Sequence, residues 1–204
     1  MAIRKEKGDY IWITWLAKLL SGETVCEWQY WLKTHYKYEK LPEDKNLISW
    51  QTKHSRMLSE LKRRILDSGR TPLVEDINSF KYNFKDICLI GGRPDLIDIV
   101  DDREVIIYDC KTGNKNKSDS IQMLLYLFCL GEGRYRDKIL KGILLYSDGY
   151  QLSFDKIDIS DDFLEDVSYF AKLLTTSTPP LKSPSTNGCR FCDIPKLECG
   201  EKIE

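Results

Sequence analysis

Residues 94–111, PDLIDIVDDREVIIYDCK, constrain the fold most strongly, because they are predicted to form one β-hairpin. Strand-forming residues flank a polar stretch at 101–103, which indicates a turn. If these three residues form the loop, Asp95 lies opposite Asp109 on one face, and Lys111 lies diagonally next to Asp95. A two-residue loop would instead send Asp109 to the other face. The register of the hairpin therefore decides whether the two acids meet.

The apolar residues favour the three-residue loop. In that register Ile97, Ile99, Val105 and Ile107 share one face, which stays apolar until it reaches its charged end. Two carboxylates at the edge of a core would repel each other and be poorly solvated. A Mg²⁺ or Mn²⁺ ion would relieve this, and a lysine beside it could orient a water or a phosphate. A surface ion pair between strands is the alternative.

A long helix at 41–69 offers a third candidate ligand. Pro42 suits its first turn and Gly69 its end. We expect His54 to face the same core as the two acids, where a nitrogen ligand would favour Mn²⁺ over Mg²⁺. A histidine satisfied within the core is the alternative. The predicted helix face repeats every three or four residues, at Leu47, Trp50, His54, Leu58, Leu61 and Ile65.

A helix at 117–131 follows the hairpin and carries a polar pair. Gln122 and Tyr126 are four residues apart and therefore share a face. They could contact a DNA backbone or brace Lys111, or they could be ordinary residues at the boundary of the core. Ser118 or Asp119 is expected to cap this helix, with Gly131 as its stop.

The order of the remaining elements predicts an α/β fold with a small central mixed sheet flanked by helices. We expect a single domain over 1–204. Its parts are an N-terminal helical region (14–70) with Cys26 and His54, a core (71–176), and a linker with a cysteine tail (177–204). Within them, the first forty residues are expected to be helical, with strands over 72–112 and 141–154 and a last helix over 160–176.

Composition limits the class of protein. Of 204 residues, 42% are hydrophobic and 31% charged, the net charge is −1, and no apolar run is long enough for a membrane span or a secretory signal. We therefore expect a cytoplasmic protein without a membrane partner. Basic residues cluster at 53–64, 111–117 and 134–138, where they could bind phosphate backbones or form solvated surface.

The seven cysteines are informative in a reducing compartment, where disulfides are rare. Cys189 and Cys192 form a C-x-x-C pair, and Cys199 follows; such thiolates can hold one metal centre. Cys26, in a polar helical context, is the best fourth ligand, because Cys88 and Cys129 lie in apolar runs and Cys110 alternates away from Asp109. The spacing suits zinc or an iron–sulfur cluster equally, and unliganded thiols are the third possibility.

These motifs together resemble the PD-(D/E)xK nuclease superfamily. The closest resemblance is to its RecB-like branch, in the CRISPR-associated RecB-like exonucleases (Cas family four). It extends from about Thr14 to Cys199. The motif GRPD resembles the family's G-x-x-D, DCK resembles its D/E-x-K, and QMLLY resembles its Q-x-x-x-Y.

The resemblance implies a restriction-endonuclease-like core and a role for each motif residue. Asp95, Asp109 and His54 would be ligands of Mn²⁺ or Mg²⁺, with Cys110 binding through its backbone carbonyl, and Lys111 would be the catalytic lysine. Gln122 and Tyr126 would act at the active site or on DNA. A 4Fe-4S cluster would be held by Cys26, Cys189, Cys192 and Cys199.

The implied activity is metal-dependent hydrolysis of phosphodiester bonds. Such an enzyme would be an exonuclease on single-stranded DNA or overhangs that trims DNA before CRISPR integration, with the integrase complex as a partner. A RecB-like repair or phage nuclease outside CRISPR is one alternative. A DNA-binding or adaptor protein with inert acids and a structural zinc site is the alternative from another class.

Overall fold

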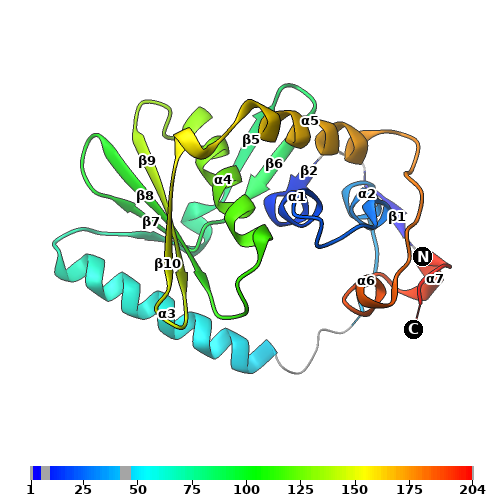
Figure 1. Ribbon diagram of the computed structural model, residues 1–204, viewed down its shortest axis with the longest axis horizontal. Helices are drawn as coiled ribbons and strands as arrows, with labels where there is room; N and C mark the ends of the chain where they lie inside the picture. Colours follow the sequence, from blue (N-terminus) through cyan, green and yellow to red (C-terminus); the bar gives the residue numbers. More distant parts are fainter. Residues whose placement is uncertain (1, 6–9, 42–46, 204) are drawn as a thin grey trace.

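The computed structural model describes residues 2–5, 10–41 and 47–203, with only the backbone of 47–50 and 75 (Figure 1). Pro42 and the side chains of Leu47 and Trp50 lie outside the described residues, so the predictions that involve them stay open.

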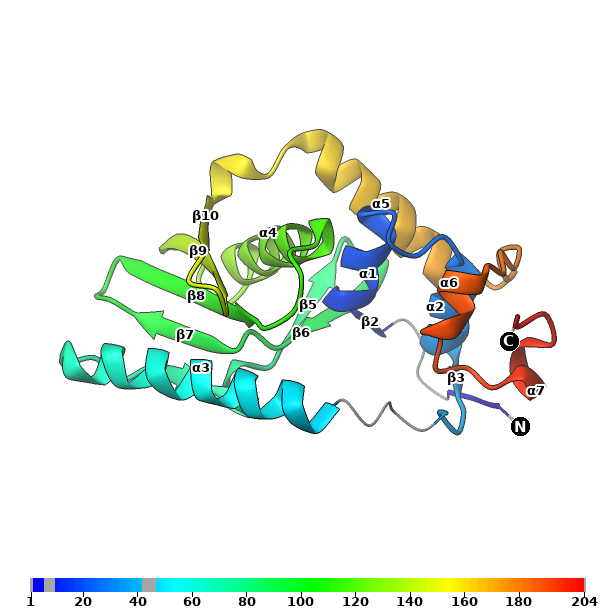
Figure 2. The ribbon, with the colours of Figure 1, turned by 60° about the horizontal axis from the view of Figure 1, so that its bottom comes forward.

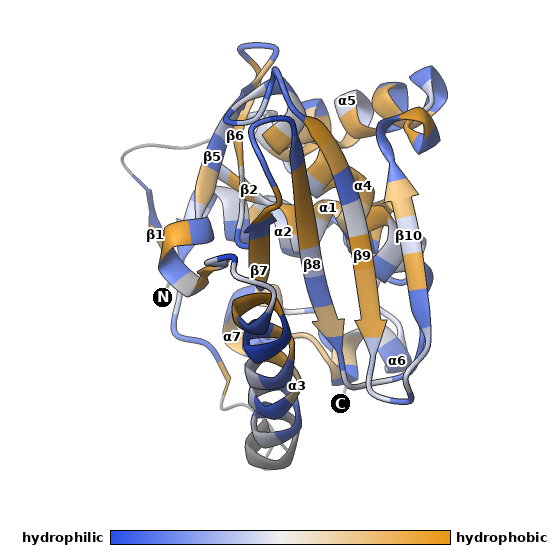
Figure 3. Cartoon of the chain, turned by 90° about the vertical axis from the view of Figure 1, so that its left-hand side faces the viewer, coloured by the Kyte–Doolittle hydropathy of each residue, from blue (hydrophilic) through white to orange (hydrophobic). Residues whose placement is uncertain are grey.

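The central sheet has five strands in the order β10-β9-β8-β7-β4. The pair β8 and β9 is parallel and the other neighbours are antiparallel, so the sheet is mixed, as predicted. Apolar residues predominate in β7 and β9 (Figure 3), where Asp98, Lys141 and Gly142 are the exceptions. The strands are β4 (Leu73–Val74), β7 (Leu96–Ile99), β8 (Glu104–Lys111), β9 (Ile139–Tyr146) and β10 (Gln151–Asp155).

The hairpin forms in the predicted register. Leu96 pairs with Tyr108 and Ile99 with Val105, which leaves three residues in the loop and confirms the odd turn. The side chain of Asp101 builds this turn, because its Oδ1 accepts hydrogen bonds from the backbone of Arg103 at 2.6 Å and of Glu104 at 2.8 Å. Continuing the same register places Asp95 opposite Asp109.

Helices cover both faces of the central sheet (Figure 2). The long helix α3 (Leu47–Asp67) packs on one face, where Leu61 and Ile65 form a small core with Leu96 and Cys110. Helix α4 (Lys117–Glu132) packs on the other face as part of the larger core. Further helices are α1 (Ile13–Leu20) and α5 (Asp161–Thr175), with short 3-10 turns at Glu75–Asn78 and Lys156–Asp158.

A second sheet of three strands extends the larger core. Its order is β2-β6-β5, with β2 parallel and β5 antiparallel to β6. Its strands are β2 (Tyr10–Trp12), β5 (Phe80–Phe84) and β6 (Cys88–Gly92). The expectation that the first forty residues are helical is therefore wrong in part: β2 comes before α1, because its backbone pairs with β6.

The second N-terminal helix lies beside the C-terminal tail, away from the central sheet (Figures 1 and 2). The helix α2 (Glu27–His35) is followed by β3 (Tyr36–Lys37), which pairs with β1 (Ile3–Arg4). The tail contributes the short helices α6 (Thr186–Arg190) and α7 (Lys196–Cys199). No helix in the described part of the chain is long and apolar enough to cross a membrane.

The ends of α4 differ from the prediction. Asn116 is its N-cap, and Asp119 completes a capping box from the third helical position instead of acting as the cap itself. The helix continues through Gly131 to Glu132, and the missing side chain of Gly131 leaves room for the Lys156 side chain, whose Nζ donates to the Gly131 backbone oxygen at 3.1 Å. Gly133, not Gly131, follows the last turn.

Candidate active site

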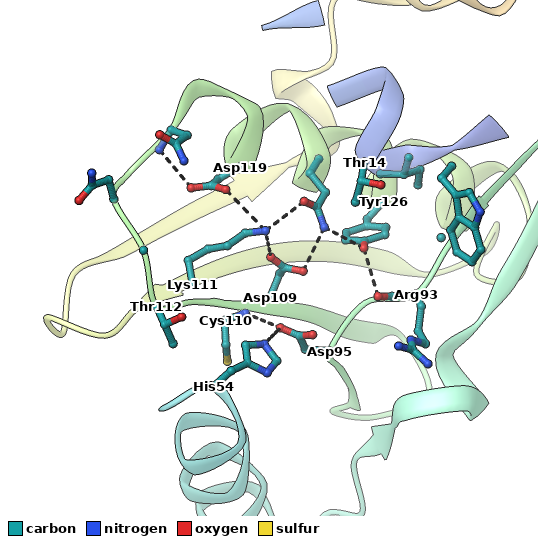
Figure 4. A pocket seen from close by; sticks show the side chains of 17 residues that line it. Thr14, His54, Arg93, Asp95, Asp109, Cys110, Lys111, Thr112, Asp119 and Tyr126 are labelled. Carbon is teal, nitrogen blue, oxygen red and sulfur yellow. Dashed lines mark hydrogen bonds and ion pairs between the residues drawn. The ribbon is translucent and has the colours of Figure 1, made fainter. Parts of the chain in front are cut away.

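Asp95 and Asp109 lie together at the open end of the hairpin (Figure 4). Asp95 precedes the first residue of β7, and Asp109 stands near the end of β8. Both line a cleft of about 610 Å³. Asp109 is only 4% exposed, whereas Asp95 is half-buried. The hairpin thus carries both predicted acids into one cavity.

Lys111 turns toward the acids. Its Nζ lies 2.8 Å from Asp109 Oδ2 and 3.0 Å from the side-chain oxygen of Gln122. Burial lowers the pKa of Lys111, but its charge contacts and hydrogen bond with Asp109, together with the charges of Asp119 and Asp95, outweigh burial and raise the pKa above its usual value. The lysine is therefore a fixed positive charge beside the carboxylate.

Asp109 is the most strongly perturbed acid of the cleft. Burial raises its pKa to about 6, against the attraction of Lys111. Its Oδ2 is buried and has no well-aligned hydrogen bond within the described part of the chain, so its 2.8 Å contact with Lys111 is an ion pair. A carboxylate oxygen that has lost water and accepts no well-aligned hydrogen bond is suited to a cation.

Asp95 is held by two groups that approach its Oδ2. The backbone nitrogen of Cys110 donates to it at 2.7 Å, and His54 Nε2 lies 3.0 Å away. The hydrogen bond between His54 and Asp95 raises the pKa of His54, although burial opposes the shift. The side chain of Cys110 points to the α3 side of the sheet, as its alternation with Asp109 predicted.

His54 reaches the acids by a different route from the one expected. It does lie on the apolar side of α3 with Leu58, Leu61 and Ile65. That side faces the small core beneath the sheet, however, and not the larger core that Asp109 faces. The imidazole meets Asp95 at the end of the strands, because Asp95 stands at the open end of the hairpin, within reach of both faces (Figure 4).

Gln122 and Tyr126 connect Asp109 in the hairpin to the helix α4. Gln122 Nε2 lies 3.3 Å from Asp109 Oδ1 and donates to the Tyr126 hydroxyl at 2.9 Å. The Tyr126 hydroxyl in turn donates to the backbone oxygen of Arg93 at 3.1 Å. Of the three possibilities left by the sequence, bracing of Lys111 is therefore supported by direct contacts.

Asp119 is a site residue that sequence reasoning missed. Its Oδ1 lies 3.5 Å from Lys111 Nζ, and its Oδ2 accepts from the Tyr146 hydroxyl at 3.1 Å. The sequence pattern predicts for Asp119 only the role of a helix cap. Its spacing of three residues from Gln122, which puts both on one face of α4, could have revealed it.

The side chains of Asp95, Asp109 and His54 are suitable ligands for a divalent cation, but in this structure they are paired with neighbouring protein groups. Two carboxylates and an imidazole are ligands that Mn²⁺ and Mg²⁺ accept. Among the residues that the structure describes, no group of three or more His, Cys, Asp or Glu side chains is arranged to hold a metal ion. In this structure Lys111 engages Asp109, while His54 and the backbone nitrogen of Cys110 engage Asp95.

Cys26, Cys189, Cys192 and Cys199 line a second, smaller cavity between α2 and the tail. Cys26 precedes the first turn of α2, and the others lie in or beside α6 and α7. All four are free thiols, and burial raises the pKa of Cys192. Cys88 and Cys129 were predicted to be core residues, and both are buried in the larger core.

Comparisons with known proteins agree with this fold. The model of the PD-(D/E)XK nuclease superfamily matches residues 16–197, which is most of the chain. The crystal structure of SSO0001 resembles this one with a TM-score of 0.54, over 98% of this chain and 90% of that chain, at 14% sequence identity. At that identity the likeness shows the fold alone. No curated protein sequence matches this chain.

Proposed function

Since the chain belongs to the PD-(D/E)XK nuclease superfamily, we propose that it is a divalent-metal-dependent exonuclease acting on single-stranded DNA or overhangs. The observation that carries the proposal is the meeting of Asp95, Asp109 and Lys111 at the open end of one hairpin, inside one cleft lined by polar side chains.

Each residue of the cleft has a proposed part. Asp95, Asp109 and His54 would hold Mn²⁺ or Mg²⁺, with the backbone carbonyl of Cys110. When bound, the ion supplies Lewis-acid chemistry for phosphodiester hydrolysis by lowering the pKa of the attacking water. Lys111 orients that water or stabilises negative charge on the phosphate. Ligands that are now paired with one another would have to exchange these partners for the ion.

Gln122 and Tyr126 act through Lys111 and Asp109. The amide of Gln122 contacts both of these side chains, and Tyr126 fixes the amide through its hydroxyl. Tyr126 is almost completely buried, so this chain of hydrogen bonds is anchored in the core. The two residues thereby hold the lysine at one distance from the acids.

Digestion of end-labelled single-stranded DNA with Mn²⁺ tests the assignment. The wild type should release short products, and Lys111→Ala should lose cleavage. Lys172→Ala, which removes an exposed lysine from α5, is the matched control and should cleave like the wild type. Equal cleavage by wild type and Lys111→Ala would overturn the active site. Rapid cleavage of circular single strands would overturn the exonuclease assignment.

We also propose that Cys26, Cys189, Cys192 and Cys199 hold a 4Fe-4S cluster. Support comes from the four thiols lining one cavity and from the resemblance of their spacing to the RecB-like set. Zinc is the rival occupant. Anaerobic purification followed by analysis for iron, acid-labile sulfide and zinc separates the two, since only the cluster contains sulfide.

A role in CRISPR spacer acquisition, with the integrase complex as partner, rests on the resemblance of the motifs. The rival from the same class is a RecB-like repair or phage nuclease, and gene neighbourhood distinguishes it. The rival from another class is a non-catalytic DNA-binding or adaptor protein with a zinc site. Absence of cleavage by both wild type and Lys111→Ala, together with DNA binding, would favour that rival.

A further inference from the structure

An aromatic surface borders the cleft on the outer face of the three-stranded sheet. Ile11 in β2 is fully buried, so its neighbours Tyr10 and Trp12 project to the opposite, outer face. Trp12 is 41% exposed, which is unusual for so large an apolar ring and leaves much of it in contact with solvent.

Gly91 explains how the rings lie against this sheet. In the sheet register Gly91 pairs with Trp12 on one side and with Lys81 on the other. A Cβ on Gly91 would lie 1.8 Å from the Tyr10 hydroxyl oxygen, so only glycine lets the Tyr10 ring lie across this strand.

Tyr10 in turn fixes Trp12. The two rings meet edge to face, with centroids 5.2 Å apart. Lys81 Nζ lies 5.5 Å from the Tyr10 centroid and holds the ring from another side. Trp12 is therefore a positioned ring, and Lys81 adds a positive charge beside it.

This surface is continuous with the cleft. Trp12 and Gly92 line both the cleft that contains Asp95 and Asp109 and a neighbouring hollow lined by Tyr10, Phe80 and Lys81. A DNA strand with a phosphate at Asp95 and Asp109 could therefore continue from the cleft into the hollow and stay in contact with the protein.

We propose that Trp12 stacks on an unpaired base of the DNA strand being cut, while Lys81 contacts the adjoining backbone. Stacking tolerates any base, because every base has a π face, and an ammonium group attracts phosphate. A base inside a duplex cannot offer its face to a side chain. The inference rests on the proposed nuclease function and narrows its substrate to strands that are unpaired next to the cleaved bond.

A comparison of the affinities for DNA strands with and without bases tests whether Trp12 stacks on a base. Fluorescence anisotropy would measure the affinity of the Lys111→Ala protein for a labelled single strand and for a strand of the same length made only of abasic sites. Adding Trp12→Ala should weaken binding of the normal strand by at least about fivefold. Binding of the abasic strand should change little, because the lost partner of Trp12 is already absent.

Two matched variants guard against a loss of fold. Leu89→Ala removes another side chain that is 41% exposed on the same face and lines neither cavity, and it should bind like its parent. Trp12→Phe should recover most of the affinity. All variants should keep the melting temperature of the parent within a few degrees.

The inference is wrong if Trp12→Ala weakens binding of both strands equally or of neither. A change of oligomeric state in place of a change in affinity would assign this face to a protein partner and would also overturn it. These failures differ from failure of the proposed function. If wild type cleaves DNA through Lys111 but Trp12→Ala behaves like its parent, only the stacking inference falls.

Discussion

Lys111 determines the chemistry of the cleft at the scale of single residues. Its ammonium lies between Asp109 and Gln122, with Asp119 at 3.5 Å. Without such partners burial would lower the pKa of this half-buried lysine, because burial favours the neutral form. The surrounding acids keep it charged, as a group that stabilises phosphate requires.

Removing the brace of Lys111 should slow catalysis without unfolding the protein. We predict that Gln122→Ala lowers kcat by about 10- to 100-fold and changes KM little, because groups that orient a catalytic residue have effects of this size. Steady-state cleavage kinetics measure the split, and Lys172→Ala serves as control. An unchanged kcat would show that Gln122 does not position the lysine.

Asp109 should make the metal-free protein more stable at lower pH. Its folded pKa of about 6 lies above the ordinary 3.8, so the folded state binds the proton more tightly. Stability from this group is therefore gained as pH falls from about 7 toward 4, by at most about 3 kcal/mol. Asp109→Asn should remove this dependence, raise the melting temperature at pH 7 and abolish cleavage.

Thermal unfolding in a chelator between pH 5 and 7.5 measures this effect. The raised pKa of His54 acts in the same direction, so the comparison of wild type with Asp109→Asn isolates the acid. Parallel pH profiles for the two proteins would contradict the prediction.

At the scale of elements, the hairpin β7–β8 sets the site by its register. Side chains alternate between faces along a strand, so the number of residues in the turn decides which face Asp109 joins. The apolar pattern was sufficient to predict this, because only one register gives a continuous buried face. The end of α4 was less predictable, because the contact that Lys156 makes with Gly131 comes from a segment distant in sequence.

Shortening the turn tests the register. We predict that deleting Asp102 reduces cleavage by about 100-fold or more, since a two-residue loop would move one acid to the other face. The substitution Asp102→Ser keeps the loop length and should leave cleavage and the melting temperature close to wild type. Cleavage by the deletion variant at the wild-type rate would show that the turn does not set the site.

At the scale of the whole molecule, the cysteine cavity links segments that are far apart in sequence. Cys26 comes from the start of α2, and the other three thiols come from the tail. Trp31 also donates to the backbone oxygen of Thr176 at 2.8 Å, so α2 and the end of α5 already touch without a cluster. A bound cluster would fasten this contact further.

Loss of one ligand should release the tail. We predict that Cys192→Ala loses its iron, melts at a lower temperature and is cut faster by protease in the linker 177–185. Cys88→Ala, which removes a buried thiol of the core, should keep its iron. Iron analysis and limited proteolysis measure both effects. A Cys192→Ala protein with wild-type melting temperature and activity would contradict a structural role for the cluster.

The sequence by itself determined what lies within single elements: the hairpin register, the positions of Asp95, Asp109 and Lys111, and the shared face of Gln122 and Tyr126. Spacing along a strand or helix sets side-chain directions there, and these are local properties. Only the tertiary structure decided which elements meet. It brought His54 from the opposite side of the sheet, added Asp119 to the lysine, and placed Trp12 beside the cleft. Those contacts arise from packing between distant segments, which local spacing does not specify.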